Sequence, residues 1–169
     1  MSESSTDYIP EIPTSGDIFR GLKHRFDADS IGSYLIGRRS SGVTVEGKLP
    51  IQKDEASKGT PYPYLIVSVG NGSPGTRSSN RTLGNGKIAK HQMLDTPFLF
   101  RVHAITDDEA EIIGKKVARS IERSPLSICG SQSFVTLFRQ GLPVEIKEGD
   151  ENYSFTMRYL IRTNAETVI

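Results

Sequence analysis

Residues 62–125 form the part of the sequence that most constrains the fold. Two runs within it, 62–69 and 98–105, are rich in β-branched, aromatic and aliphatic residues and have the length of strands. The first run is apolar at nearly every position, as expected for a strand that is covered on both faces. A long polar segment separates the two runs, and an amphipathic segment follows the second. This order predicts two strands, a long connection and a helix.

The amphipathic segment at 107–124 has the start and stop signals of a helix. Thr106 and Glu109 match the capping-box pattern, in which side chains satisfy backbone groups of the first turn. Pro125 is expected to end the helix because proline cannot continue one. Apolar residues recur at helical spacing and predict one buried stripe, formed by Ala110, Ile113, Val117 and Ile121.

The chain before this block predicts helices and loops. Residues 1–15 hold two prolines among polar residues and are expected to form an extended N-terminal arm. A helix is expected from Ser15 onward, with Thr14 or Ser15 as its N-cap and four apolar residues on one face. The remaining expectations for this half are a short helix over 31–37, a brief strand at 43–45 and a loop at 46–61.

The chain after the helix predicts two further strands, at 134–139 and 153–162. In the second, large apolar residues alternate with mostly polar ones, as in an antiparallel strand with one buried face. A hairpin turn at 148–152 is expected to join it to residues 143–147. These elements predict an α+β fold: an antiparallel sheet of four or five strands with two main helices packed on one face. We expect residues 16–169 to form a single domain of this kind.

The composition indicates a soluble protein that is made in the cytosol. Hydrophobic residues make up 36% of the chain, and no run approaches the roughly 18–20 apolar residues that a membrane span needs. The polar start of the chain predicts that there is no signal peptide. The single cysteine, Cys129, cannot form an internal disulfide. A net charge of +1 argues against a dedicated nucleic-acid-binding protein.

The motifs in the sequence do not indicate an enzyme, a cofactor or a metal site. Residues 70–75 match the G-x-G-x-x-G dinucleotide fingerprint, and Asp95 follows at about the usual spacing. That fingerprint requires its glycines to open a helix, whereas Pro74 and a polar run follow here. His103 lies in an apolar run and is expected to be a sheet residue rather than a metal ligand. Cys129 lacks a CxxC partner and is expected to be a packing residue.

Charged residues of opposite sign gather in two separate segments. The four bases of segment 70–94, which contains no acid, are Arg77, Arg81, Lys87 and Lys90. The candidate acidic counter-surface in segment 145–151 is formed by Glu148, Asp150 and Glu151. Residues 70–89 show no apolar periodicity and are expected to form a loop, which is longer than compact domains usually contain. This basic loop is expected either to contact phosphates or a neighbouring subunit's acids, or to be a solvated connection.

The order of these elements resembles that of the tail terminator (tail completion) proteins of long-tailed bacteriophages. The resemblance spans roughly residues 16–163. Its features are, in order, a helical segment with an apolar tail at 26–36, a proline–tyrosine strand opening at 61–66, a variable loop, the strand at 98–104, the helix that starts at Thr106 and a closing pair of strands. The loop at 70–89 and the N-terminal arm are longer than the core pattern requires.

The resemblance implies a structural, non-enzymatic role in the virion. Proteins of this family form a hexameric ring that caps the tail tube, stops its polymerisation and docks to the head connector. The implied partners are other copies of the chain, the tail tube protein and a connector or stopper protein, with assembly in the host cytoplasm. If the basic loop faces the lumen of the ring, it would lie beside the genomic DNA and contact its backbone. If it faces outward, it would contact the neighbouring ring.

Two other functions remain open from the sequence. A tail tube protein or another head–tail joining protein would have a similar build and would use the loop to bridge rings. A sheet-based module that binds a peptide or nucleic acid would instead use an exposed edge near Pro63 together with the basic loop.

Overall fold

The structure is a computed structural model, and it describes residues 13–39, 48–122, 125–128, 131–138, 144–146 and 153–168. These residues contain three helices, α1 (Ser15–Ala28), α2 (Ile31–Gly37) and α3 (Asp107–Glu122). The strands are β1 (Ile51–Lys53), β2 (Tyr64–Val69), β3 (Ser73–Thr82), β4 (Ile88–Ala104), β5 (Leu126–Ile128), β6 (Ser131–Phe138), β7 (Val144–Ile146) and β8 (Tyr153–Val168). The fold is α+β, as predicted.

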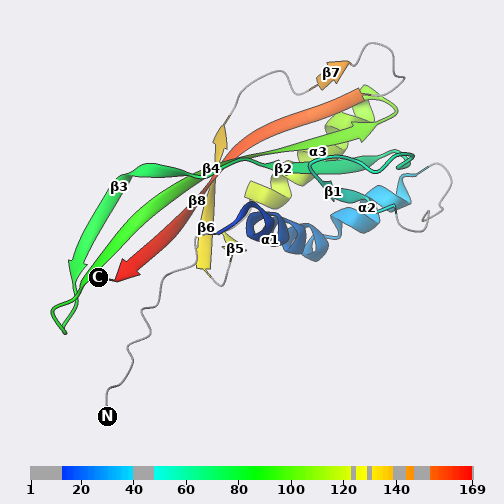
Figure 1. Cartoon of the computed structure of the whole chain (residues 1–169). Coiled ribbons are helices and arrows are strands. Elements are labelled where there is room, and N and C mark those ends of the chain that lie inside the picture. Colours follow the sequence, from blue (N-terminus) through cyan, green and yellow to red (C-terminus); the bar gives the residue numbers. More distant parts are fainter. Residues whose placement is uncertain are drawn as a thin grey trace.

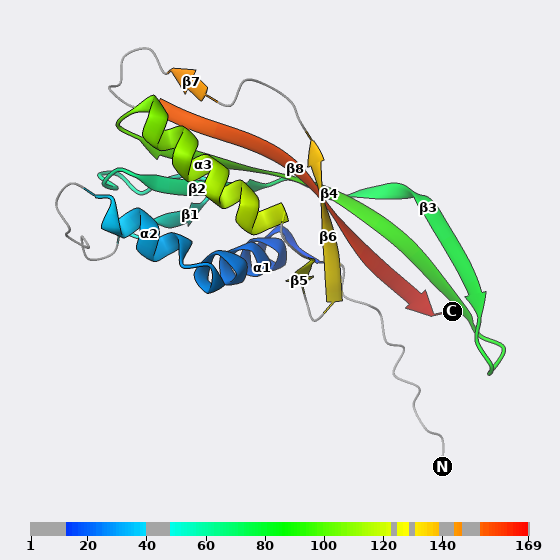
Figure 2. The same cartoon turned by 180° about the vertical axis from the view of Figure 1, so that it is seen from behind.

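The strands form one twisted sheet, and the helices pack on one of its faces (Figures 1 and 2). Its main path runs β1-β2-β4-β8-β6-β5, with β3 added beside β4 and β7 beside β8. β1 and β2 are parallel, and every other described pair is antiparallel. The predicted antiparallel sheet with helices on one face is confirmed, and its eight strands exceed the four or five expected.

The predicted helix caps are present in the structure. At the start of α1, the Thr14 side chain accepts a hydrogen bond from the Asp17 backbone, and the Asp17 side chain accepts one from the Thr14 backbone. These hydrogen bonds from Thr14, together with Arg20, lower the pKa of the Asp17 carboxyl to about 2. At the start of α3, Thr106 Oγ1 accepts a hydrogen bond from the Glu109 N–H at 3.3 Å. α1 and α3 therefore begin where their capping residues predict.

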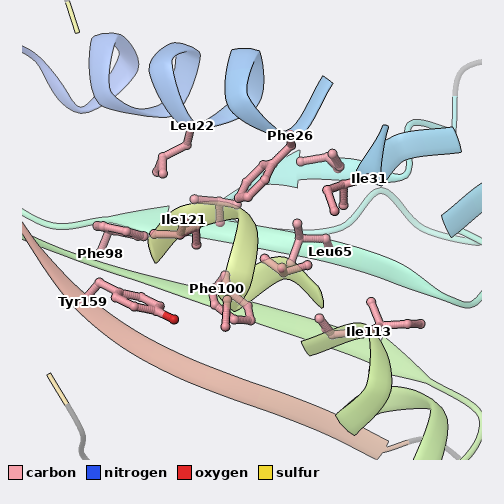
Figure 3. Packing of buried hydrophobic residues seen from close by; sticks show 14 of the residues in the cluster. Leu22, Phe26, Ile31, Leu65, Phe98, Phe100, Ile113, Ile121 and Tyr159 are labelled. Atoms are coloured by element: carbon pink, nitrogen blue, oxygen red, sulfur yellow. The ribbon is translucent and has the colours of Figure 1, made fainter. Parts of the chain in front are cut away.

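The hydrophobic core lies between the helices and the sheet (Figure 3). α1 contributes Leu22 and Phe26, and the predicted apolar stripe of α3 is fully buried. On the sheet, the Tyr159 ring stacks on Phe98 and Phe100, with ring centroids 5.3 and 5.8 Å apart. Side chains of the helices and of the sheet thus form one core beneath the helical layer.

β4 and β8 are the longest strands, with 17 and 16 residues. They pair without interruption from Ala104 opposite Tyr153 to Ala89 opposite Val168. β2 and β3 follow each other along the other edge of β4, with the break between them at residues 70–72. One half of the β4–β8 pair lies over the helices, and the other half extends well beyond them (Figure 1).

Two segments that were predicted as loops contain strands. Most of 70–89 belongs to β3 and to the start of β4, and 46–61 contains β1. The first prediction is wrong because these strands are polar at nearly every position and so lack the alternation by which strands are recognised. The brief strand at 43–45, the turn at 148–152 and most of the N-terminal arm lie outside the described residues.

Candidate functional site: the β-arm and the open face of the sheet

The part of the sheet that extends beyond the helices is the most distinctive feature of the molecule (Figure 2). We call it the β-arm and define it as residues 73–95, which comprise β3, the turn at 83–87 and residues 88–95 of β4, together with residues 162–168 of β8. Residues 88–95 span about 25 Å at the usual rise of a strand. Within residues 74–94, the side chains that the structure describes are those of 82–88, 93 and 94, and none of them is buried. This part of the sheet is joined to the rest of the molecule by strand pairing.

All four predicted basic residues belong to the β-arm, although the sequence placed them in a loop. Arg81 pairs with Ala89, and Lys90 pairs with Asn80 on one side and with Thr167 on the other. Arg77 lies within a bulge of β3, where the register shifts between Pro74 and Ser78. Lys87 is exposed in the turn between β3 and β4. The candidate acidic residues Glu148, Asp150 and Glu151 lie outside the described residues.

The turn at the tip of the β-arm is tight. The Leu83 N–H donates to the Lys87 carbonyl at 2.7 Å, and the Gly86 N–H donates to the Leu83 carbonyl at 2.9 Å. Gly86 has φ +80°, a backbone conformation that glycine adopts without steric cost. Ile88, the first residue of β4, has 44% of its surface exposed. The tip therefore presents a cation beside an apolar side chain.

The glycines of the G-x-G-x-x-G match lie at the base of the β-arm and have a structural role. The Gly70 N–H donates to the Pro97 carbonyl at 2.8 Å. A Cβ atom at Gly70 would lie 3.0 Å from Pro97 Cγ, and one at Gly72 would lie 2.8 Å from Thr96 Oγ1. The chain continues into β3 and not into a helix, so the glycines serve the close approach of two strands. The structure agrees with the sequence argument against a dinucleotide site.

Asp95, the acid that follows the glycines in the sequence, forms an ion pair across β4 and β8. Its two carboxylate oxygens accept hydrogen bonds from Arg162 Nε and Nη2, at 2.7 and 2.9 Å. The hydrogen bond from Arg162 lowers the pKa of Asp95 below its ordinary value. Asp95 and Arg162 are register partners, so this bidentate pair clamps the two strands where the β-arm leaves the core.

The face of the sheet that lies opposite the helices carries both basic and apolar side chains. Leu99 pairs in register with Ser68 and Arg158, on the face opposite the buried Phe98 and Phe100. An open cavity of about 480 Å³ lies at the base of the β-arm, lined in part by Ser68, Gly70, Pro97, Leu99, Arg158 and Leu160. The sequence pattern indicated that Arg158 and Leu160 leave the core, but it did not indicate the cavity.

A second cavity lies on the helical side. It has a volume of about 510 Å³ and is lined by Asp29, Ile31, Lys116, Arg119, Ser120 and Glu122. The Ser120 hydroxyl donates to the Asp29 carboxylate at 2.5 Å. Acids and bases line this cavity together, so its charge does not select one class of ligand.

His103 is a buried residue of the sheet, as the sequence predicted. Its ring stacks on Tyr64, with centroids 4.8 Å apart, and Tyr64 stacks on Tyr62 at 5.3 Å. In the described part of the chain, no group of three histidine, cysteine, aspartate or glutamate side chains is placed to hold a metal ion. The helices there are also too short or too polar to cross a membrane.

The similarity of this chain to known proteins is confined to solved structures. No family model and no curated protein matches the chain. Eight chains of solved structures resemble it. One of these is 12% identical in sequence with a TM-score of 0.47, and the match covers 89% of this chain and 96% of that one. That structure is labelled by a sequence identifier, which describes no activity.

Proposed function

We propose that this chain is a structural protein of the neck of a long-tailed bacteriophage. Its copies assemble into a ring that caps the tail tube, ends tube polymerisation and joins the tail to the head connector. The proposal starts from the resemblance to tail terminator proteins in the order of the sequence elements. It assigns no chemical reaction to the chain.

The β-arm is the observation that supports this proposal most directly. Fixing the backbone of a residue costs about 1–2 kcal/mol in conformational entropy, and none of the described side chains of residues 82–88, 93 and 94 is buried to offset that cost. An ordered extension of this kind is expected to be useful through contacts with another molecule. The four bases of segment 70–94, and the open cavity at the base of the β-arm, give such a contact both charge and apolar surface.

A ring also requires that each copy present two different surfaces, one for each neighbour. The β-arm, with an excess of positive charge, is the first of these surfaces in the proposal. Segment 145–151, with its acids Glu148, Asp150 and Glu151, supplies the opposite charge in the sequence. The tail tube protein and a connector or stopper protein would bind the two rims of the ring, and genomic DNA would pass through its lumen.

The binding-module alternative is weakened at one point. It relied on an exposed sheet edge near Pro63, but β1 pairs with residues 65–67 of β2 on that edge. A tail tube protein remains the nearest alternative, because it would use the β-arm in the same way. Its subunits would continue to add to one another, whereas a terminator stops after one ring.

The test is the mass and shape of the purified protein, measured by light scattering and negative-stain electron microscopy. Closed rings, formed by the protein alone or on addition of tail tubes, support the proposal. Open tubes would reassign the chain to the tube proteins. A monomer that does not bind tail tubes but binds DNA would reassign the chain to nucleic-acid binding. Raising the salt concentration would then weaken its binding to DNA steeply.

A charge-reversed variant tests the role of the β-arm in the same assay. Arg77→Glu combined with Arg81→Glu is expected to abolish assembly while leaving the fold unchanged. The matched control combines Lys58→Glu with Lys115→Glu, which makes the same change in net charge at exposed positions outside the β-arm. Equal loss of assembly in both variants would mean that total charge, and not the β-arm, matters.

A further inference from the structure

Both long edges of the β-arm lack a neighbouring strand among the described residues. Within the described residues, β3 pairs with β4 and has no partner on its other edge. The pairing of β6 with β8 ends at Arg162, so among the described strands residues 163–168 pair only with β4. Open edges present rows of backbone N–H and C=O groups, which readily pair with a strand of another chain.

The direction of the strands determines how two copies can join through these edges. β3 and β8 are each antiparallel to β4, and they are therefore parallel to each other. If a second copy continues the sheet in the same orientation, its β3 lies beside β8 of the first and runs parallel to it. The alternative is a twofold contact, in which two β3 edges or two β8 edges pair antiparallel.

Charge favours the contact between different edges. β3 contains Arg77 and Arg81 and no acid, whereas residues 163–168 contain Glu166 and no base. Two β3 edges would bring bases next to bases, which destabilises strand pairing, and the same holds for the acids of two β8 edges. Pairing β3 with β8 instead brings opposite charges together.

We propose that residues 163–168 of one copy pair in parallel with β3 of the next copy, so that the sheet continues from subunit to subunit. The inference rests on the proposed ring and adds a backbone contact between subunits to the attraction between opposite charges proposed above. Pairing is expected over residues 78–82, because the register of β3 is regular there and the bulge that follows Pro74 interrupts it. Both edges are used once per copy, which is the head-to-tail arrangement that rings require.

Engineered disulfides test this contact directly. In a Cys129→Ser background, Ser79→Cys is combined in turn with Asn164→Cys, Ala165→Cys or Thr167→Cys. Ser79 pairs with His91 and Ala165 pairs with Gln92, so the β3 and β8 positions lie on opposite sides of β4. They are about 10 Å apart within one chain, beyond the reach of a disulfide. A bond therefore forms only between copies.

At least one double variant is expected to give a ladder of covalent oligomers on a non-reducing gel, and the ladder should vanish with reductant. The single variants Ser79→Cys and Ala165→Cys are the matched controls. Each is expected to stay monomeric on the gel, because the proposed contact does not place a residue of one copy next to the same residue of another copy. Circular dichroism confirms that every variant is folded before oxidation.

The other outcomes separate this inference from the proposed function. Rings seen by electron microscopy, without a ladder of covalent oligomers in any double variant, would overturn the inference but still support the proposed function. A covalent dimer from either single variant would show a twofold contact and would also overturn it. Absence of both rings and ladders would overturn the inference and the proposed function together.

Discussion

Among single residues, Gly114 has the least room for change. It lies in the middle of α3, and a Cβ atom there would be 2.1 Å from Cδ1 of the Phe155 ring. Alanine is the better helix former by about 1 kcal/mol, but overpacking a core typically costs about 1–3 kcal/mol. We therefore expect Gly114→Ala to lower the free energy of unfolding, measured by urea denaturation.

Gly37, at the end of α2, provides the matched control for that experiment. A Cβ atom there would have no neighbour within 4 Å. Gly37→Ala is expected to leave stability unchanged or to raise it by roughly 0.5 kcal/mol, from helix propensity alone. If both variants were equally stable, α3 would not lie on Phe155 as described.

Tyr159 is expected to make stability depend on pH in the alkaline range. Burial, and then the adjacent Glu122 carboxylate, raises the pKa of its hydroxyl above the ordinary value of 10.0. The unfolded chain loses this proton first as pH rises, so folding loses stability above about pH 10. Tyr159→Phe also removes the hydrogen bond to Glu122 at 3.2 Å, at a cost of about 1 kcal/mol at neutral pH.

The measurement for Tyr159→Phe is the change in unfolding free energy between neutral pH and about pH 10.5. The variant should lose less stability over this range than the original chain. An identical pH dependence in the variant and the original chain would contradict the role assigned to Tyr159.

At the scale of elements, the β-arm is expected to be removable. Ser73 and Asp95 are register partners, so a two-residue Asn-Gly turn can replace residues 74–94 and close the hairpin at that point. Because none of the described side chains in this segment, those of 82–88, 93 and 94, is buried, the shortened chain should keep its near-ultraviolet circular dichroism and a cooperative thermal transition. It should no longer assemble. Loss of cooperative unfolding would show that the β-arm supports the core.

The helices and the core strands could be predicted because their signals are local. Thr14 and Thr106 cap helices whose apolar stripes follow at helical spacing, and Phe155, Tyr159 and Ile161 alternate along a half-buried strand. β3 has no such signal, since both of its faces are polar and its strand conformation depends on pairing with β4. That pairing in turn depends on β8, whose residues 164–168 pair with residues of β4 that lie more than 70 positions away in the sequence.

The candidate site was predictable in composition and not in geometry. The four bases of segment 70–94 were visible from the sequence, but it predicted one loop where Arg77, Arg81 and Lys90 lie on strands and Lys87 in the turn between them. The cavity at the base of the β-arm is formed by residues from β2, β4 and β8, which only the sheet brings together. Tertiary contacts of this kind cannot be recognised from the spacing of residues along the sequence.

At the scale of the whole molecule, segregated charge predicts that assembly depends on salt. The chain has a net charge of only +1, so the overall electrostatic repulsion between copies is small. Whether copies assemble therefore depends on attractions between local groups of opposite charge. Raising sodium chloride from about 0.05 M to about 0.5 M shortens the screening length and should weaken assembly, followed by light scattering. The chain without residues 74–94 is the control, and its melting temperature should change little. Assembly that is insensitive to salt would point to the apolar cavity instead.

The unbroken course of β4 and β8 also has a mechanical consequence. The same two backbones run from the tip of the β-arm to the region beneath α3, without a loop or linker between them. A pull along the tip would load their hydrogen-bonded ladder in shear, so that many bonds resist together instead of opening one after another. The β-arm is thus a stiff lever, and a displacement imposed at its tip is transmitted to the helical layer rather than absorbed at a joint.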